Sequence, residues 1–458
     1  MTAGRLAPLG AAFVMAACAP VPLQPSAPPS AAVGYVVIGP GGEAIARAIV
    51  DSTTCPDLDV DGAPRAMSVR APAQRLAQRR GQAKPADFLV TVCELALPAG
   101  AQRVALAGRA LPLPKPAPSR IVVVGDSGCR VYATIQQACN DPAQWPFARV
   151  AAAAAATAPD LVIHVGDYHY RESACPPTAP GCTGTPWGYG YDVWDSDFVA
   201  PARPLLAAAP WIVVRGNHET CDRAGQGWWR LLDPRPLAPR QDCNDAADDA
   251  LGDYSEPYAV PIGNGERVVV FDSSNAGNGP IAVDGVAYRT YRAQIQRLFA
   301  AQASAPAASA FFAVHHPPLA FAANPARPGA PFPGNLALQA TLGAEFGAAL
   351  FPPSVGGVLS GHNHAFETVS FASGQPPQVV VGNGGTALDA PLPEPFPPGL
   401  TPLPGAVVRE LRDADRFGFV TLDRASAGWT LTAFDVNGTP MTTCTLGARA
   451  LACKPIAR

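Results

Sequence analysis

The sequence lacks three features that would each assign it to a large class of proteins. It has no excess of charge of one sign, because 33 basic residues stand against 36 acidic ones, so we expect no nucleic-acid-binding surface. It has no CxxC pair, so a metal site built from cysteine thiolates is not expected. Its first apolar run, residues 6–17, is too short to span a bilayer.

The N-terminus has the pattern of an export signal. Arg5 precedes the apolar run, which ends in MAAC at 15–18 and so resembles a bacterial lipobox with Met15 in the place usual for Leu. We expect residues 1–18 to be a lipoprotein signal peptide that leaves Cys18 lipidated, and residues 19–33 to be a flexible tether. An ordinary signal peptide is the alternative. Both predict export, and the first predicts a lipid-anchored protein of the bacterial periplasm or cell surface.

The remaining cysteines predict disulfide bonds. Removing Cys18 from the 11 cysteines leaves ten, an even number in a chain expected to be exported. Sequence order suggests local pairs, although it does not fix connectivity and long-range pairing stays open. The expected pairs are Cys55 with Cys93, Cys129 with Cys139, Cys175 with Cys182, Cys221 with Cys243, and Cys444 with Cys453.

The hydrophobic pattern predicts two regions of different texture. Residues 34–113 contain short β-like runs and no long helical period, which indicates a small N-terminal all-β domain. A proline-rich linker at 112–119 precedes residues 119–458, where apolar strands alternate with Ala-rich helical stretches, as in an α/β domain. We expect strands at 121–125, 161–166, 211–216, 267–273, 309–314 and 355–361, helices near 143–158, 289–303 and 337–350, and long loops at 171–200, 220–257 and 320–335.

Five of the predicted strands end in the same kind of polar segment. The segments are GDSG at 125–128, GDYHY at 166–170, GNHE at 216–219, HHPP at 315–318 and GHNH at 361–364, and all 7 histidines lie in or beside them. Groups just beyond the carboxyl ends of parallel strands meet at one edge of a sheet. Carboxylate, phenolate, amide and imidazole groups converging there suit a pair of transition-metal ions.

This order of segments resembles the calcineurin-like metallophosphoesterases, and among them the purple acid phosphatases, over about residues 121–368. The wider superfamily usually carries a His in the first segment where this chain has Gly128, and Tyr170 supplies the missing ligand in the purple acid phosphatase manner. The resemblance implies an α/β fold, with a metallophosphoesterase β-sandwich core flanked by helices. It also implies two metal ions, Fe(III) and a divalent ion (Zn, Mn or Fe).

The resemblance assigns the ligands residue by residue. The first metal is expected on Asp126, Asp167, Tyr170 and His364, and the second on Asn217, His315 and His362, with Asp167 bridging the two. We prefer His315 to His316 because the ligand in this family typically stands two residues before a proline, as His315 stands before Pro317, and we expect His316 to lie behind it.

Four further groups are interpreted around these ligands. The resemblance points His218 at the substrate, where it would stabilise phosphoryl oxygens or protonate the leaving alkoxide, unless it only supports a ligand. His164 is expected in the core and His169 in a loop. Arg171, Arg215 and Arg223 are candidates either for a phosphate clamp or for structural roles.

The resemblance implies hydrolysis of small phosphate monoesters by attack of a metal-bound hydroxide. A phosphodiesterase acting on nucleotide or glycerol-type diesters is the alternative, and Trp228 and Trp229 in the loop at 220–257 are candidates to stack on a ring of such a substrate. A non-enzymatic binding protein that keeps a degenerate fold would be expected to have lost ligands, and none is missing.

Overall fold

The computed structural model describes Met1 and residues 32–79, 84–132, 134–304 and 308–456. Residues 32–458 form one compact unit. The predicted signal peptide, Cys18 and nearly all of the predicted tether lie outside the described residues. In the part of the chain that is described, no helix combines the length and the apolar character needed to cross a membrane.

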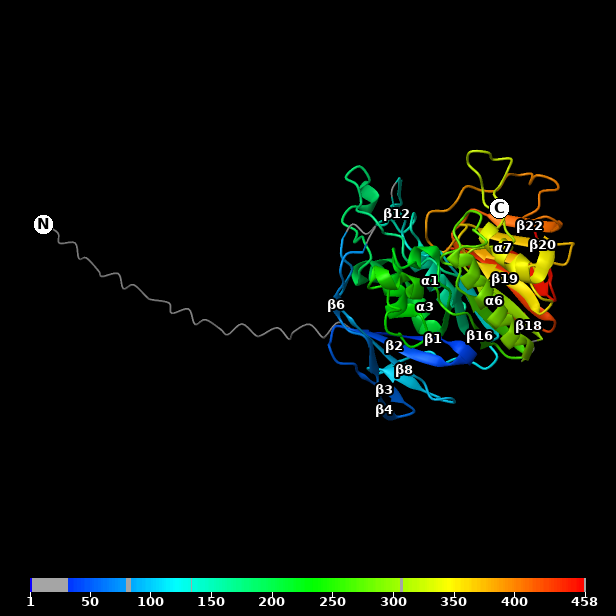
Figure 1. The fold of residues 1–458 in the computed structure, drawn as a ribbon. Helices are drawn as coiled ribbons and strands as arrows, with labels where there is room; N and C mark the ends of the chain where they lie inside the picture. Colours follow the sequence, from blue (N-terminus) through cyan, green and yellow to red (C-terminus); the bar gives the residue numbers. More distant parts are fainter. Residues whose placement is uncertain (2–31, 80–83, 133, 305–307, 457–458) are drawn as a thin grey trace. The chain divides into compact units, whose positions relative to one another are not determined.

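Two large sheets form the centre of the fold (Figure 1). The first has eleven strands in the order β26 (Ala450–Cys453), β25 (Pro440–Gly447), β24 (Gly428–Asp435), β23 (Gly418–Ala425), β11 (Arg120–Val124), β14 (Leu161–His164), β15 (Trp211–Val213), β1 (Val33–Ile38), β2 (Ala44–Val50), β8 (Thr91–Ala96) and β5 (Ser68–Ala71). The second has seven, in the order β16 (Tyr258–Pro261), β17 (Glu266–Phe271), β18 (Ser309–Val314), β19 (Val355–Ser360), β21 (Gln378–Val381), β20 (Phe366–Phe371) and β22 (Val408–Ala414).

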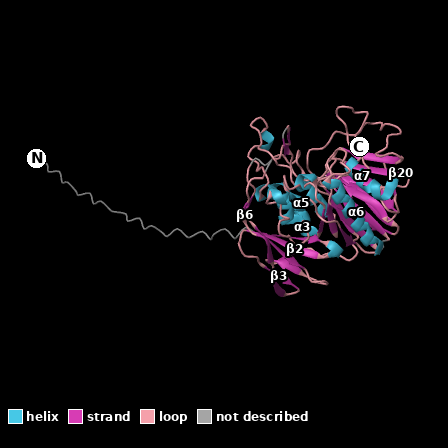
Figure 2. Cartoon of the chain, in the orientation of Figure 1, coloured by secondary structure: helices cyan, strands magenta, loops and turns pink. Residues whose placement is uncertain are grey.

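The helices cover the outer faces of these sheets (Figure 2). Helices α1 (Phe147–Ala156) and α3 (Ala200–Ala208) pack on the first sheet, and α6 (Val286–Ser304) and α7 (Leu336–Phe346) pack on the second. A third apolar cluster, with residues from both sheets, fills the space between them. The predicted β-sandwich flanked by helices is therefore confirmed, and the three long predicted helices are present.

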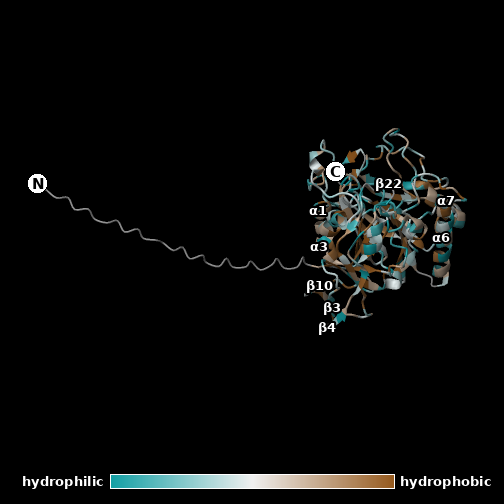
Figure 3. Ribbon diagram, turned by 60° about the vertical axis from the view of Figure 1, so that its left-hand side comes forward, coloured by the Kyte–Doolittle hydropathy of each residue, from teal (hydrophilic) through white to brown (hydrophobic). Residues whose placement is uncertain are grey.

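Strand β11 shows why the sequence folds in this way. Ile121 and Val123 point into the cluster between the sheets, whereas Val122 and Val124 face the helical layer. Successive side chains of a strand point to opposite faces, so a strand that is covered on both sides needs an unbroken apolar run. In Figure 3 the brown colour of hydrophobic residues is seen on strands within the body of the molecule.

The N-terminal region is rich in strands, as predicted, but its strands do not form a sheet system of their own. β1, β2, β8 and β5 extend the first sheet, and β1 pairs in parallel with β15 through Val37 and Trp211. A separate four-stranded sheet contains β3 (Asp57–Val60), β4 (Ala63–Ala66), β9 (Val104–Leu106) and β10 (Arg109–Ala110), and a two-stranded one contains β6 (Gln74–Arg75) and β7 (Asp87–Phe88). That residues 34–113 fold as a domain by themselves stays a prediction.

All five predicted disulfides are present. They join Cys55 to Cys93, Cys129 to Cys139, Cys175 to Cys182, Cys221 to Cys243, and Cys444 to Cys453. Five disulfides fit a protein that works in an oxidising compartment outside the cytoplasm.

Candidate metal centre

The predicted ligands lie where central strands of both sheets end. Asp126 follows β11, Asp167 follows β14, and His362 follows β19. All three have backbone φ angles in the left-handed region, at 53°, 57° and 71°. Non-glycine residues rarely adopt this conformation, and such residues gather at functional sites because the surrounding structure must hold them there. The surrounding structure therefore holds these turns in an uncommon backbone conformation, as is typical of functional sites.

Tyr170 lies at the centre of the first group of ligands. Its hydroxyl oxygen is 2.8 Å from Oδ2 of Asp167, 2.9 Å from Oδ1 of Asp126 and 3.0 Å from Nε2 of His364. Tyr170 and His364 alone are 194 residues apart in the chain. The four residues predicted for the first metal are thus brought together at hydrogen-bonding distance.

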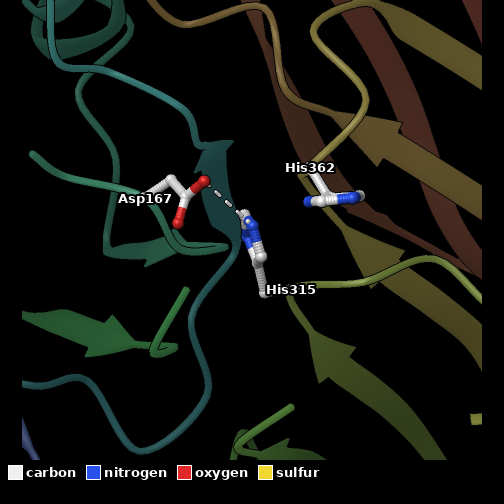
Figure 4. A group of neighbouring side chains, drawn as sticks. All are labelled: Asp167, His315 and His362. Atoms are coloured by element: carbon white, nitrogen blue, oxygen red, sulfur yellow. Dashed lines mark ion pairs between the residues drawn. The ribbon is translucent and has the colours of Figure 1, made fainter. Parts of the chain in front are cut away.

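The second group adjoins the first through Asp167 (Figure 4). Oδ1 of Asn217 lies 3.1 Å from Nε2 of His315 and 3.0 Å from Nδ1 of His362. Nε2 of His315 lies 3.2 Å from Oδ2 of Asp167, and one ligand atom from each of Asp167, His315 and His362 falls within 4.8 Å of the others. Asp167 contacts both groups, as a bridging carboxylate would.

The hydrogen bonds behind the imidazoles favour metal binding. Nδ1 of His315 lies 2.9 Å from the carbonyl oxygen of Val165, and Nδ1 of His364 lies 2.9 Å from that of Ala387. A carbonyl oxygen can only accept, so each Nδ1 carries the proton, and Nε2 is left as an unprotonated ligand atom. In His362 the two nitrogens exchange roles. Its Nε2 lies 2.7 Å from Oδ1 of Asn278, which can only accept, so Nε2 carries the proton and Nδ1 faces Asn217 as the ligand atom.

The charges of the first group also fit a bound cation. Burial and the neighbouring Asp167 raise the pKa of Asp126 well above its ordinary value. Burial, together with Asp126 and Asp167, raises the pKa of Tyr170 well above 10.0. Several groups that become anionic in one buried place repel each other unless a positive charge lies among them. Carboxylate, phenolate and imidazole donors supply the ligand types for two transition-metal ions.

His218 lies beside this centre and is held by a carboxylate. Its Nδ1 is 2.6 Å from Oε1 of Glu172, and its Nε2 is 3.8 Å from Oδ2 of Asp167. Burial alone would raise the pKa of Glu172. The neighbouring His218 and Arg223 outweigh burial and lower this pKa below its ordinary value. Glu172 is therefore ionised and accepts the Nδ1 proton, which leaves Nε2 of His218 as the titrating atom on the cavity side.

The other three histidines stand outside the two groups. His316 is buried, with Nδ1 3.0 Å from Oγ of Ser273. His164 lies in the core, where it stacks on Tyr168 and its Nε2 is 3.1 Å from Oγ of Ser127. His169 is also fully buried, stacked on Tyr189.

The three candidate arginines differ in their surroundings. Arg171 forms a buried ion pair with Asp197, at 2.6 Å, and Arg215 donates to the backbone carbonyl groups of Glu219 and Gly252. Both support the fold. Arg223 contacts Glu172 and lies 3.0 Å from Nε2 of His218, at the edge of the centre.

The suggested stacking role of the loop tryptophans is wrong. Trp228 and Trp229 expose only 2% and 1% of their surface and belong to the apolar cluster under the helices. They are candidates from the sequence because they lie in a long loop that follows a strand end, where ligand-binding residues often lie. Instead they anchor the loop in the core, so they cannot stack on a substrate.

A cavity of about 430 Å³ opens over the two groups. Asp167, Asn217, His218, His362 and His364 form its metal side. The rest of its wall includes residues that the sequence patterns did not single out: Arg130, Asn278, Phe332, Leu336 and Asp389. A cavity of this volume accommodates a small-molecule substrate.

Glu219, the last residue of the third segment, has a positioning role that the sequence did not reveal. Its carboxylate accepts hydrogen bonds from the backbone N–H groups of Gly216, Asp167 and Tyr168, at 3.0, 3.2 and 2.9 Å. These bonds hold the turn that presents Asp167.

Known structures share this fold. A purple acid phosphatase, PPD1, from yellow lupin (Lupinus luteus) seeds is 16% identical, with a TM-score of 0.51, over 89% of this chain and 72% of its own. The structure described as PhoD is 14% identical, with a TM-score of 0.54, over 93% of this chain and 92% of its own. At these identities the likeness concerns the fold. No curated protein matches the chain.

The family model for calcineurin-like phosphoesterases matches residues 119–366, which is more than half of the chain. The matched range contains all five segments that converge on the centre, from Asp126 to His364. The chain therefore belongs to the calcineurin-like phosphoesterase family and is a metal-dependent hydrolase of phosphoric esters.

Proposed function

We propose that this protein hydrolyses phosphate monoesters at a dimetal centre of the purple acid phosphatase type. The observation that carries the proposal is Tyr170, whose hydroxyl lies within 3.0 Å of Asp126, Asp167 and His364. A phenolate among carboxylates and an imidazole is a hard donor set suited to a trivalent ion, whereas the imidazole-rich second group suits a divalent one.

The residues that would hold the ions follow from the two groups. Asp126, Asp167, Tyr170 and His364 would hold Fe(III), and Asn217, His315 and His362 would hold Zn, Mn or Fe in the divalent state, with Asp167 shared. When bound, two such ions activate water and stabilise charge on the attacking and leaving oxygens of a displacement at phosphorus.

His218 is the proposed catalytic side chain of the protein itself. Glu172 fixes the imidazole through Nδ1, so that Nε2 is presented at the cavity beside Asp167. When the ring is protonated, Nε2 can donate a proton from there to the alkoxide that leaves phosphorus, or a hydrogen bond to a phosphoryl oxygen; burial and Arg223 lower the pKa of His218 from 6.5 to about 4, so acidic pH favours this form. The ring also packs against Tyr170, with 3.9 Å between ring centroids, which fixes its distance from the first group.

The alternative activity, hydrolysis of nucleotide or glycerol-type diesters, uses the same ligands. The burial of Trp228 and Trp229 removes the feature that favoured a ring-binding loop. The apolar wall of the cavity, with Phe332 and Leu336 partly exposed, accommodates an alcohol group from either class of ester.

The test is turnover by the purified protein loaded with iron and zinc. We expect it to hydrolyse 4-nitrophenyl phosphate with a higher kcat/KM than bis(4-nitrophenyl) phosphate. A higher value for the diester would establish the alternative. A protein with two bound metal ions that turns over neither ester would disprove both.

We also propose that the protein is anchored through lipidated Cys18. The five disulfides support export, and the MAAC segment supports the anchor. In a bacterial host, the full chain should partition into the membrane fraction, and Cys18→Ser should release it into the soluble periplasm. An unmodified Cys18 in the mature protein, seen by mass spectrometry, would contradict the anchor.

A further inference from the structure

Arg130 gives the cavity its positive charge. Among the described residues that line the cavity, it is the one arginine or lysine. It follows the first segment, four residues after Asp126. The same stretch of chain therefore positions both a predicted metal ligand and this guanidinium. Its charge acts to lower the pKa of both Tyr170 and His364, which places it close to the first group.

The guanidinium of Arg130 is not paired with any acidic residue that the structure describes. Its Nε is buried and has no hydrogen-bond partner, and the ion pairs within 4.0 Å do not include it. Asp389, which also lines the cavity, accepts a hydrogen bond from the backbone N–H of His364 through its carboxylate, at 2.8 Å. A partly buried cation without a partner is costly, so Arg130 is set up to receive an anion from the cavity.

The backbone of Arg130 is fixed relative to the metal ligands. Its N–H donates to Oε1 of Gln137 at 2.9 Å, and Gln137 returns a backbone bond to its carbonyl oxygen at 2.8 Å. The same Oε1 accepts from the N–H of Ala387 at 3.0 Å, and the carbonyl oxygen of Ala387 holds His364. Gln137 therefore ties Arg130 and His364 into one framework, which the neighbouring Cys129–Cys139 disulfide closes.

We infer that Arg130 binds a non-bridging oxygen of the substrate phosphoryl group and makes the site selective for monoesters. The inference deepens the proposed function and rests on it. A monoester presents a phosphoryl group with up to two negative charges and three non-bridging oxygens, whereas a diester has one charge and two such oxygens. Two metal ions and a planar, permanently charged guanidinium match the first better than the second.

The test compares Arg130→Ala and Arg130→Lys with Arg327→Ala. Arg327 is an exposed arginine in the loop at 320–335 that does not line the cavity, so its replacement removes one positive charge without touching the site. Metal content is measured first, and binding of inorganic phosphate is then measured by calorimetry on the metal-loaded proteins. The final measurement is kcat/KM for 4-nitrophenyl phosphate and for bis(4-nitrophenyl) phosphate.

We expect Arg130→Ala to keep both metals and to weaken phosphate binding and monoester kcat/KM by about 10- to 100-fold, as for the loss of a charged hydrogen bond. Diester kcat/KM should change by less than about 3-fold, because that substrate lacks the third oxygen. Arg130→Lys should be intermediate, since it keeps the charge without the planar pair of donors. Arg327→Ala should match the wild type.

Two results would overturn the inference. One is unchanged phosphate binding by Arg130→Ala or Arg130→Lys with both metals present. The other is an equal loss of kcat/KM on both esters. If phosphate binding weakens as expected but the wild type hydrolyses no ester, Arg130 is an anion-binding residue and the proposed function is the part that fails.

Discussion

The hydroxyl of Tyr170 lies 3.0 Å from Nε2 of His364, although the two residues are 194 positions apart. One follows a strand of the first sheet and the other follows a strand of the second. The contact therefore exists only when both sheets are assembled with their carboxyl ends side by side. The proposed first metal position therefore forms only when the whole β-sandwich is folded.

Replacing Tyr170 with Phe tests the phenolate ligand. The iron-loaded wild type should show a visible absorption band from charge transfer between tyrosinate and Fe(III), and Tyr170→Phe should lose that band while iron stays bound to the other ligands. Absorption spectra and metal analysis of the same samples measure both quantities.

Tyr168→Phe is the matched control. Tyr168 is buried in the same turn, but its hydroxyl donates to the carbonyl oxygen of Val214, at 3.1 Å. Its replacement should leave the band unchanged. A band that survives in Tyr170→Phe, or disappears in Tyr168→Phe, would refute the assignment of Tyr170 to Fe(III).

The two adjacent histidines give a second prediction. His315→Gln should lower the metal content from two ions to about one, because Nε2 of His315 faces Asn217 and Asp167. His316→Gln should keep both ions, because His316 is engaged with Ser273; a weakening of metal affinity by about 10-fold is the effect expected for a residue behind a ligand. Metal analysis after dialysis decides between them, and a greater loss in His316→Gln would reverse the choice.

The sequence predicted which side chains meet at the sheet edge because the signals for their positions are local. Each segment that carries a predicted ligand stands directly after an apolar run, and the geometry of a parallel sheet brings such segments to one edge. The side chains on the cavity wall away from the metal ligands could not be predicted in this way. Arg130 and Asn278 follow no repeated pattern, and their place on the wall depends on how loops fold over the edge.

The N-terminal strands show the same limit in the fold. The pattern of residues 34–113 predicts strands correctly, but pairing of β1 with β15 joins Val37 to Trp211 across the chain. Nothing in a short strand specifies such a distant partner, because its alternating pattern suits any sheet edge with an apolar face. The prediction that the tryptophans of the loop at 220–257 stack on a substrate was wrong for a related reason, because the burial of a side chain depends on what packs over it.

His218→Asn separates the two roles proposed for His218. We expect kcat to fall by about 10²- to 10⁴-fold for an alkyl phosphate, as for the loss of a general acid, with both metals retained. The loss should be much smaller for 4-nitrophenyl phosphate, because 4-nitrophenolate leaves without protonation. Similar losses on both substrates would assign His218 to stabilisation of the phosphoryl oxygens.

Glu172→Gln is the companion variant to His218→Asn. An amide in place of the carboxylate weakens the hold on Nδ1 of His218, so Glu172→Gln should reproduce the dependence on leaving group with a smaller loss. A loss that does not depend on the leaving group would show that Glu172 acts in some other way.

The last prediction concerns stability and its dependence on pH. Burial acts to raise the pKa of Asp160. Hydrogen bonds from Lys115, Ser119 and Arg120 outweigh burial and lower this pKa from 3.8 to about 2. A carboxylate with a lowered pKa stabilises the folded state above its unfolded pKa, and the contribution is lost as the pH falls through the folded pKa. Asp160→Asn should therefore lower the free energy of unfolding by about 2 kcal/mol at pH 7, and by about half of that at pH 3.

Asp59→Asn is the control for that measurement, because Asp59 also pairs with a basic residue, Arg103, but both side chains are exposed, at 43% and 59%. An exposed pair contributes about 0 to 1 kcal/mol, so Asp59→Asn should change the free energy of unfolding little at either pH. Denaturant unfolding of the metal-loaded proteins at pH 7 and pH 3 gives the four differences. Equal effects of Asp160→Asn at both values would show that the ionised form of Asp160 is not what stabilises the fold, and that its hydrogen bonds serve the amide equally well.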